Sequence, residues 1–191
     1  MSEDLDWYGR ELRAQAYEGE SFVDVDMTEV VDEGTTFTDC TFRLVLLNAS
    51  THTNAAFTNC RFSRCTFFDT TFRSCKLVGS TFDACTFGPL TVEGGDWSYV
   101  GLAGADLRTA TFRGVRLREA DLTGARFDGA VLAACDLSGV STRATSLVGC
   151  DLQESDLSTL DPATVDLRGA VVGWRQAVQL ATSLGLDVRP D

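Results

Sequence analysis

Four segments of the chain share one pattern: ADLRT (residues 105–109), ADLTG (120–124), CDLSG (135–139) and CDLQE (150–154). Each segment has a small residue, then an aspartate, then a leucine, then two variable positions. Each segment also starts three five-residue units after the one before it. A five-residue period is therefore the first property to test along the rest of the chain.

The period holds over most of the sequence. Every fifth residue from Phe22 to Val172 gives 31 positions, and 27 of these are apolar. A hydrophobic content of 44% would give about 14 by chance. Eleven of the 12 phenylalanines fall in this frame. The position two residues earlier is small or modestly apolar at 30 of its 31 occurrences, so two positions in every five are specified.

This period fits neither of the common secondary structures, because a helix repeats every 3.6 residues and a strand every two. A chain that turns a corner every five residues, with one large and one small side chain pointing inward, does fit. The large inward positions form the expected core, represented by Phe62, Phe67, Phe72, Phe82, Leu107, Leu122 and Leu137.

All seven cysteines occupy the small inward position, at residues 40, 60, 65, 75, 85, 135 and 150. A buried thiol behaves as a small hydrophobic group, so packing is the favoured role. Stacked pairs such as Cys40 with Cys60 and Cys65 with Cys85 are alternatives that approach disulfide distance. No CxxC pair with zinc spacing occurs, and no metal or cofactor is expected.

The repeat resembles that of the pentapeptide-repeat family, whose unit is A(D/N)LXX. The resemblance implies an all-β solenoid in which four units make one coil: a right-handed quadrilateral β-helix in which each face recurs at every fourth unit. We expect the β-helix over residues 20–172. Residues 1–19 form an acidic N-terminal segment or a partial first coil, and residues 173–191 form a C-terminal cap.

Four large inward positions carry an unexpected residue: Asp32, His52, Thr142 and Pro162. Each is a candidate bulge, loop or frame slip, and Pro162 is expected to end the regular coils because proline cannot donate to a β-ladder. His52 is expected to be either a tolerated residue of the core or a loop residue turned outward.

After residue 172 the spacing becomes helical. A short α-helical cap is expected, with one apolar face that suits a two-fold dimer. The residues of this face are Trp174, Ala177, Val178, Ala181 and Leu184.

The composition excludes several classes of function. The net charge of −12 disfavours direct binding of nucleic acid. No apolar run is long enough to span a bilayer and the N-terminus lacks the pattern of a signal peptide, so a cytoplasmic protein without a membrane partner is expected. With one histidine and no assembled Ser/His/Asp set or phosphate-binding loop, neither catalysis nor a small-molecule substrate is expected.

The closing segment, LDPATVDLRGAVVGWRQAVQLATSLGLDVRPD, resembles the ends of the quinolone-resistance proteins of the Qnr and MfpA family, which have an LDP break, a V-D-L unit, a W-R-Q-A helix and an L-G-L exit. The unbroken frame is more similar to MfpA, because some Qnr proteins carry inserted loops. The resemblance implies a homodimeric, DNA-shaped rod that binds DNA gyrase (GyrB, GyrA or both), competes with DNA and protects the enzyme from fluoroquinolones.

DNA mimicry requires carboxylates on the surface, and the aspartate before many central residues is the candidate. Such an aspartate could equally accept hydrogen bonds from turn amides. An alternative function is a pentapeptide-repeat scaffold for an unrelated protein partner, because the repeat specifies shape and not activity. The candidate partner-binding residues are Asp96, Asp106, Asp121, Asp136, Asp151, Asp156 and Asp166.

Overall fold

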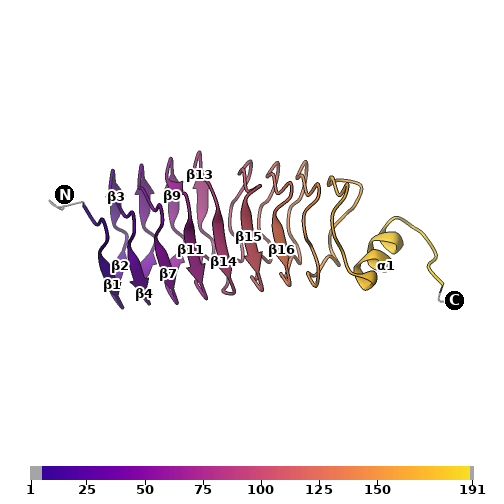
Figure 1. Cartoon of the computed structure of the whole chain (residues 1–191), viewed down its shortest axis with the longest axis horizontal. Helices are drawn as coiled ribbons and strands as arrows, with labels where there is room; N and C mark the ends of the chain where they lie inside the picture. The colour runs from indigo at the N-terminus through magenta and orange to yellow at the C-terminus, as the bar shows by residue number, and fades with distance from the viewer. Residues whose placement is uncertain (1–5, 190–191) are drawn as a thin grey trace.

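The computed structural model describes residues 6–189 and shows a straight rod that ends in one helix (Figure 1). Residues 1–5 of the acidic N-terminal segment and residues 190–191 of the C-terminal segment lie outside the described residues. The chain winds as a right-handed quadrilateral β-helix, and this confirms the expected fold class. The two ends of the chain lie at opposite ends of the rod.

Four parallel sheets form the faces of the rod, and we name each by its number of strands. The seven-strand face contains β1 (Glu11–Arg13), β4 (Val31–Glu33), β7 (Thr51–Thr53), β11 (Thr70–Arg73), β14 (Leu90–Glu93), β15 (Ala110–Arg113) and β16 (Val131–Ala133). The four-strand face contains β3 (Ser21–Val23), β6 (Thr41–Arg43), β9 (Arg61–Ser63) and β12 (Thr81–Asp83). The three-strand face contains β2 (Ala16–Glu18), β5 (Thr36–Thr38) and β8 (Ala56–Thr58), and the two-strand face contains β10 (Thr66–Phe67) and β13 (Thr86–Phe87).

Every strand pairs with the strand of the neighbouring coil, four units away, as the quadrilateral coil requires. Leu12 pairs with Asp32, for example, and Phe62 with Phe82. Isolated bridges with the same spacing continue the faces beyond the strands, up to the bridge between Asp151 and Val171. The four-unit register is therefore kept from the first described coil to the last.

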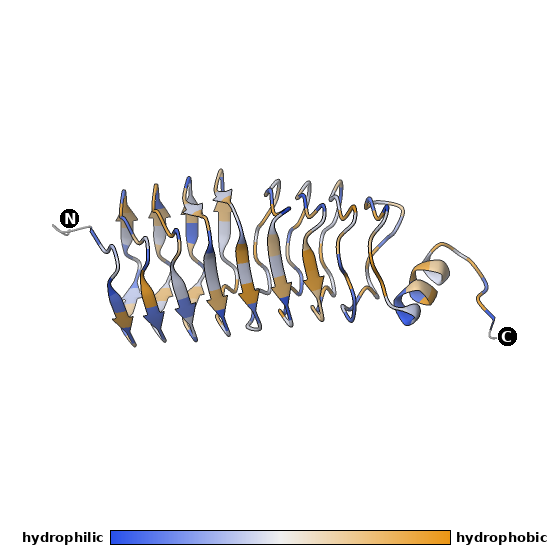
Figure 2. Cartoon of the chain, viewed as in Figure 1, coloured by the Kyte–Doolittle hydropathy of each residue, from blue (hydrophilic) through white to orange (hydrophobic). Residues whose placement is uncertain are grey.

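The large inward side chains fill the rod. All seven representative core residues are buried: Phe62, Phe67, Phe72, Phe82, Leu107, Leu122 and Leu137. Apolar residues recur in coil after coil along the whole length (Figure 2). Trp7 and Leu12 are also buried, and β1 pairs with β4, so residues 6–19 form part of a first coil.

Small polar residues at the other inward position satisfy backbone groups inside the rod. The Ser80 hydroxyl donates to the carbonyl of Phe57 (2.7 Å), and Thr145 donates to the carbonyl of Leu122 (2.7 Å). Both bonds reach back from one coil to the previous one. Since an unpaired buried carbonyl is costly, this explains why serine, threonine and cysteine share the small position.

The region around Pro162 departs from the regular coil. Residues 162–164 form a turn, in which Asp161 accepts a hydrogen bond from the amide of Ala163 (2.9 Å). The bridges of Asp166 to Ser146 and of Val171 to Asp151 then restore the register. The expectation that Pro162 ends the regular coils is therefore wrong, because the ladder resumes after one altered corner.

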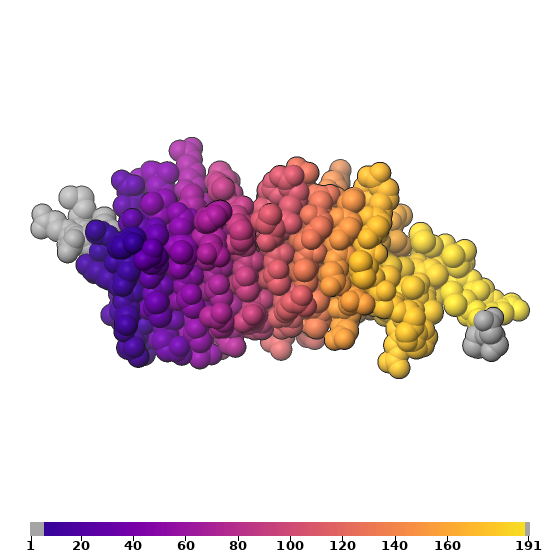
Figure 3. Space-filling model, viewed as in Figure 1, coloured from indigo at the N-terminus to yellow at the C-terminus, as the bar shows by residue number. Residues whose placement is uncertain are grey.

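Helix α1 (Trp174–Ser183) follows the last coil and lies at the C-terminal end of the rod (Figures 1 and 3). Among the described residues, no helix is long and apolar enough to cross a membrane.

Candidate functional site

The seven candidate aspartates lie on all four faces of the rod. Asp96, Asp136 and Asp156 share one ladder on the three-strand face, with Arg116 between the first two. The other four are divided among the remaining faces: Asp106 and Asp166 on the two-strand face, Asp121 on the four-strand face and Asp151 on the seven-strand face. The seven candidates therefore do not form a single acidic face, since only the first three are brought together.

Each of these aspartates also has a structural role, because its carboxylate accepts a hydrogen bond from the amide two residues later. The distances run from 2.9 Å for Asp156 to 3.4 Å for Asp106. The other five make the same bond: Asp96, Asp121, Asp136, Asp151 and Asp166. One carboxylate oxygen thus stabilises the turn, which leaves the other to contact an arginine of the chain or a partner.

Arginines neutralise four of the seven. Arg116 pairs with Asp96 (2.9 Å) and Arg118 pairs with Asp136, both between coils. Arg108 and Arg168 pair within the turn, with Asp106 (2.6 Å) and Asp166 (2.7 Å). No arginine of the described chain pairs with Asp121, Asp151 or Asp156, whose second carboxylate oxygens remain unpaired by protein cations.

The same contacts shift the ionisation of these groups. The Arg108 guanidinium lowers the pKa of Asp106, and the Arg168 guanidinium lowers the pKa of Asp166. At Asp96 partial burial opposes ionisation, but hydrogen bonds from Ser98 and Arg116 outweigh it and lower the pKa. These carboxylates therefore stay ionised well below neutral pH.

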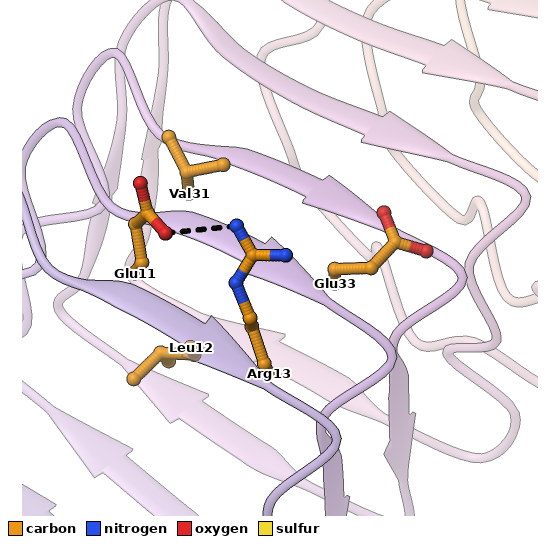
Figure 4. A pocket seen from close by; sticks show the side chains of 5 residues that line it. All are labelled: Glu11, Leu12, Arg13, Val31 and Glu33. Carbon is orange, nitrogen blue, oxygen red and sulfur yellow. Dashed lines mark hydrogen bonds and ion pairs between the residues drawn. The ribbon is translucent and has the colours of Figure 1, made fainter.

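The greatest concentration of negative charge lies elsewhere, in the first two coils. Residues 6–39 contain ten carboxylates and only two arginines, Arg10 and Arg13. Figure 4 shows part of this region, where Arg13 pairs with Glu11 (2.9 Å) beside a shallow hollow of about 140 Å³. Glu33 and the exposed Val31 border the same hollow.

A Ser/His/Asp set is present inside the rod, although the sequence did not predict one. His52 Nδ1 lies 3.0 Å from Asp32 Oδ2, and His52 Nε2 lies 3.1 Å from Ser50 Oγ. Asp32 and His52 occupy matching positions of β4 and β7, so the four-unit register brings them together. Both strands are regular, which excludes a bulge or a frame slip there and places His52 in the core.

This set differs from a hydrolytic triad in two respects. All three residues are buried, with at most 1% of each exposed. In addition, the Ser50 hydroxyl donates to the carbonyl of Leu47 (2.6 Å), so His52 Nε2 must donate to Ser50 Oγ. In a triad the serine donates to the histidine instead. The set is therefore a polar bridge between coils, and the His52 ring also stacks on Phe72 (5.0 Å).

The cysteines have a packing role. All seven are free thiols, so neither stacked pair forms a disulfide. Cys75 donates to the carbonyl of His52 at 3.3 Å, in the same manner as the small hydroxyl residues. Burial raises the pKa of Cys60, Cys75 and Cys150 to about 12, which disfavours the reactive thiolate at neutral pH.

Helix α1 docks on the last coil through one polar residue. Gln176 is buried, and its amide group donates to the carbonyls of Leu152 (2.6 Å) and Ser155 (2.8 Å) and accepts from the amide of Gly173 (2.6 Å). One coil earlier, the Leu132 carbonyl accepts from the Ser155 hydroxyl and the Cys135 carbonyl accepts from the amide of Asp156, so Gln176 supplies both donors that a further coil would provide. The sequence contained this signal only as a glutamine near the start of the helix.

The predicted apolar face of α1 points away from the rod. Trp174 is 74% exposed, Leu184 59% and Val178 37%, and Ala177 is exposed as well. Only Ala181 of this set is partly buried. Within the described chain, this face is therefore left without an apolar partner.

Comparisons with known proteins agree with this architecture. The family described as "Pentapeptide repeat region" matches residues 65–142, and the family described as "Pentapeptide repeats (8 copies)" matches residues 125–161. No curated protein matches the chain.

Among solved structures, QnrB1 is similar over nearly its whole length. A trypsin-treated variant of QnrB1 covers 93% of this chain and 99% of its own, with 26% sequence identity and a TM-score of 0.67. The full-length form covers 93% and 100%, with 25% identity and a TM-score of 0.55. QnrB1 is described as a plasmid-mediated fluoroquinolone resistance protein. From its repeat, its coil geometry and these matches, the chain belongs to the pentapeptide-repeat proteins.

Proposed function

We propose that this chain is a non-enzymatic, DNA-mimicking rod that binds DNA gyrase, competes with DNA, modulates the enzyme and protects it from fluoroquinolones. The observation that carries the proposal is the similarity to QnrB1 over 93% of this chain and 99% of that one. Because the similarity covers nearly all of both chains, it concerns most of the surface that a partner would meet. A cytoplasmic location follows from this partner.

The charge of the N-terminal coils supports DNA mimicry. Residues 6–39 have a net charge of −8, from ten carboxylates and two arginines. Asp32 is buried beside His52, so the other residues give a surface charge of −7. Two coils occupy about 10 Å along the rod axis, so this end carries about one net surface charge per 1.4 Å. B-DNA carries about one charge per 1.7 Å. We call residues 6–39 the acidic coils. They reach the charge density of DNA, although their charges are spread over four faces.

The uncovered face of α1 supports a homodimer as the acting form. Trp174, Val178 and Leu184 would pack against the same residues of a second copy, which is the self-complementary contact of a two-fold axis. Dimerisation through α1 would join two rods end to end and place an acidic end at each extremity.

The dimer has a direct test. Trp174→Glu places a charge in the proposed contact, and we expect a monomer by light scattering with the coils intact by circular dichroism. Gln179→Glu, at an exposed position of the same helix outside this face, is the matched control and should leave the mass unchanged. An unchanged mass for Trp174→Glu would argue against this contact.

Within the proposed family of gyrase-directed proteins, the unbroken frame favours the MfpA type. The four-unit register runs through every described coil without an inserted loop. The contact with gyrase would then involve the faces and ends of the rod itself, through GyrB, GyrA or both.

A scaffold for an unrelated protein is the second candidate, and one observation favours it. Arginines neutralise four of the seven candidate aspartates, so the C-terminal half of the rod lacks a continuous negative stripe. If this half makes the functional contact, its mixed charges fit an ordinary protein partner better than a DNA-binding groove.

The test measures gyrase supercoiling, ATP hydrolysis and fluoroquinolone-stabilised DNA cleavage with increasing amounts of the protein. We expect a concentration-dependent change in turnover and a loss of drug-stabilised cleavage. No effect on any of the three at micromolar protein would contradict the proposal and favour the scaffold.

Two sets of substitutions locate the contact. Asp26→Asn with Glu29→Gln and Asp39→Asn reduces the charge of the acidic coils, and Asp96→Asn with Asp136→Asn and Asp156→Asn reduces the ladder on the three-strand face. Asparagine keeps the oxygen that accepts the turn amide, so the coils should remain intact. We expect the substitutions in residues 6–39 to weaken the effect of the protein on gyrase more than the substitutions in the ladder of the three-strand face.

A further inference from the structure

Three arginines gather on the four-strand face in the N-terminal half of this acidic rod. Arg43 ends β6, Arg61 begins β9 and Arg64 follows β9, and all three are exposed. The register of β6 and β9 places Arg43 opposite Ser63 and Thr41 opposite Arg61. With strand and coil spacings of about 3.3 Å and 4.8 Å, the Cα atom of Arg43 lies about 6–8 Å from those of Arg61 and Arg64. We call these three residues the arginine patch.

The three arginines of the patch lie close together, and none of them has an ion-pair partner among the residues that the structure describes. Most other arginines of the described chain pair with a carboxylate in the same turn or the next coil, as Arg116 does with Asp96 and Arg73 with Glu93. In the patch, the corresponding positions hold Thr41 and Ser63 instead. None of its three guanidiniums forms an ion pair or a side-chain hydrogen bond with another described residue.

Carboxylates occur only at the edges of the patch. The amide of Asp24 bonds to the carbonyl of Arg43 (2.9 Å), and the amide of Arg64 bonds to the carbonyl of Asp83 (2.9 Å), so each aspartate lies in a flanking coil. Residues 40–95 as a whole contain five cationic and three anionic side chains and so have a net charge of +2. This band is therefore positive in a chain of net charge −12.

Exposed apolar side chains begin beside the arginine patch, at the corner where the four-strand face ends, and continue across the two-strand face. Leu44 and Leu46 are each 39% exposed and Phe68 is 60% exposed. The amide of Leu44 bonds to the carbonyl of Ser63 (3.0 Å), which puts Leu44 next to Arg64. The Phe68 ring lies over Gly88 of the next coil, so its orientation is fixed by contact. We call Leu44, Leu46 and Phe68 the apolar ridge.

We propose that the arginine patch and the apolar ridge form a docking surface for an acidic segment of a protein partner that also carries aromatic or aliphatic side chains. The guanidiniums would bind carboxylates, and the ridge would cover the apolar side chains. Arginine and aromatic residues are the side chains that contribute most at protein interfaces. This surface is distinct from the acidic coils and from α1, and it does not depend on the proposed action on gyrase.

Charge favours a protein segment over a nucleic acid. A nucleic acid has about one negative charge per nucleotide and extends beyond the patch, where it would meet the acidic coils. A short acidic segment needs only the three guanidiniums, and its apolar side chains gain from the ridge.

The test is fluorescence anisotropy of the full-length protein with a fluorescein-labelled peptide of twelve residues in which Asp and Glu alternate with Leu and Phe. We expect saturable binding that weakens with added salt. Arg43→Glu with Arg64→Glu should weaken binding at least tenfold, and Phe68→Ser should weaken it at least threefold. All three residues are exposed, and circular dichroism checks that the coils remain.

Arg113→Glu with Arg143→Glu is the matched control, because it makes the same change in net charge at two exposed arginines outside the patch. This control should change the affinity less than threefold. Any one of three results would overturn the proposal. These are no binding at millimolar peptide, an equal loss of affinity in both double variants, and tighter binding of a twelve-nucleotide single-stranded DNA than of the peptide.

Discussion

The two halves of the rod follow the same five-residue frame but build different corners. Up to residue 95 most units are short strands, and many have phenylalanine at the centre. Rings one coil apart stack on each other, at 4.9 Å for Phe22 and Phe42, 4.7 Å for Phe42 and Phe62 and 4.8 Å for Phe62 and Phe82. These distances equal the spacing of about 4.8 Å between neighbouring strands.

After residue 95 only β15 and β16 remain as strands, and hydrogen-bonded turns replace the others. The amide of Ala105 bonds to the carbonyl of Leu102 (3.0 Å), and the amide of Ala125 bonds to that of Leu122 (2.9 Å). Between them, Gly104 and Gly124 have φ values of +69° and +68°. A turn closed in this way, with a positive φ at its third residue, is of type II.

The difference shows that the central residue helps to select the corner. Every leucine-centred unit from Leu102 to Leu167 closes its turn except Leu132, which continues the strand ladder of Phe112. A stacked phenylalanine ladder holds its units extended, whereas leucine lets the corner close. The five-residue frame therefore determines the rod, and the size of the central side chain influences whether each unit is an extended strand or a closed turn.

The largest effect is expected at the buried pair of Asp32 and His52 in the N-terminal half. His52→Phe would add a ring to the stack below Phe72 but leave the Asp32 carboxyl without its histidine partner. Since removing one member of a buried pair is strongly destabilising, we expect a loss of about 3–5 kcal/mol in the free energy of unfolding by urea.

Asp32→Leu together with His52→Phe is the matched control. It removes both members of the pair and leaves mainly the Thr35 amide without its acceptor. We expect it to recover at least half of the loss. If the double variant is as unstable as His52→Phe alone, the unpaired Asp32 carboxyl is not the cause of the lost stability.

The next prediction compares the phenylalanine core of the N-terminal half with the leucine core of the C-terminal half, both on the four-strand face. Phe62→Ala removes a ring stacked on both sides, and we expect a loss of about 3–5 kcal/mol. Leu122→Ala, at the same position of the C-terminal half, should cost about 2–4 kcal/mol. Urea unfolding of both variants measures the difference, and a larger loss for Leu122→Ala would contradict the importance of the stacked ladder.

A smaller effect is expected where the rod ends. Gln176→Met would leave the carbonyl of Ser155 without a donor and leave the Leu152 carbonyl with only the Ser155 amide, at a cost of about 1–3 kcal/mol. We expect faster hydrogen exchange over α1 and little change in the coils. Gln179→Met, at an exposed position of the same helix, should leave exchange unchanged, and equal effects of the two would refute the role of Gln176.

The smallest effect concerns the closed turns themselves. Gly104 has a φ of +69° and open space around it, so Gly104→Ala adds only backbone strain. We expect a loss of about 1–2 kcal/mol in the free energy of unfolding. Gly104→Asn should lose less, because asparagine tolerates a positive φ better. Equal losses would mean that the turn geometry is not the cause.

The spacing of apolar residues predicted the five-residue frame and the core, and the resemblance to pentapeptide-repeat proteins predicted the four-unit coil. The sequence did not predict the contact between Asp32 and His52. The two residues lie a full coil apart in the chain, and each departs from the apolar pattern at the large inward position of its own unit. The register explains both at once, as neighbours on one face. A search for paired exceptions separated by four units would have found them.

The surface was harder to predict. The aspartates of the repeat were identified, but their neutralisation by Arg108, Arg116, Arg118 and Arg168 depends on side chains in the same turn or a neighbouring coil. The helix was also expected, yet its docking through Gln176 was not, because helical periodicity locates an apolar face without showing which side meets the rod.

The most direct test of the proposed function is the binding of this protein to immobilised DNA gyrase by interferometry, with increasing amounts of linear duplex DNA. We expect saturable binding that the duplex displaces, because the acidic coils and DNA would occupy the same surface. Absence of binding, or binding that persists at saturating DNA, would contradict DNA mimicry.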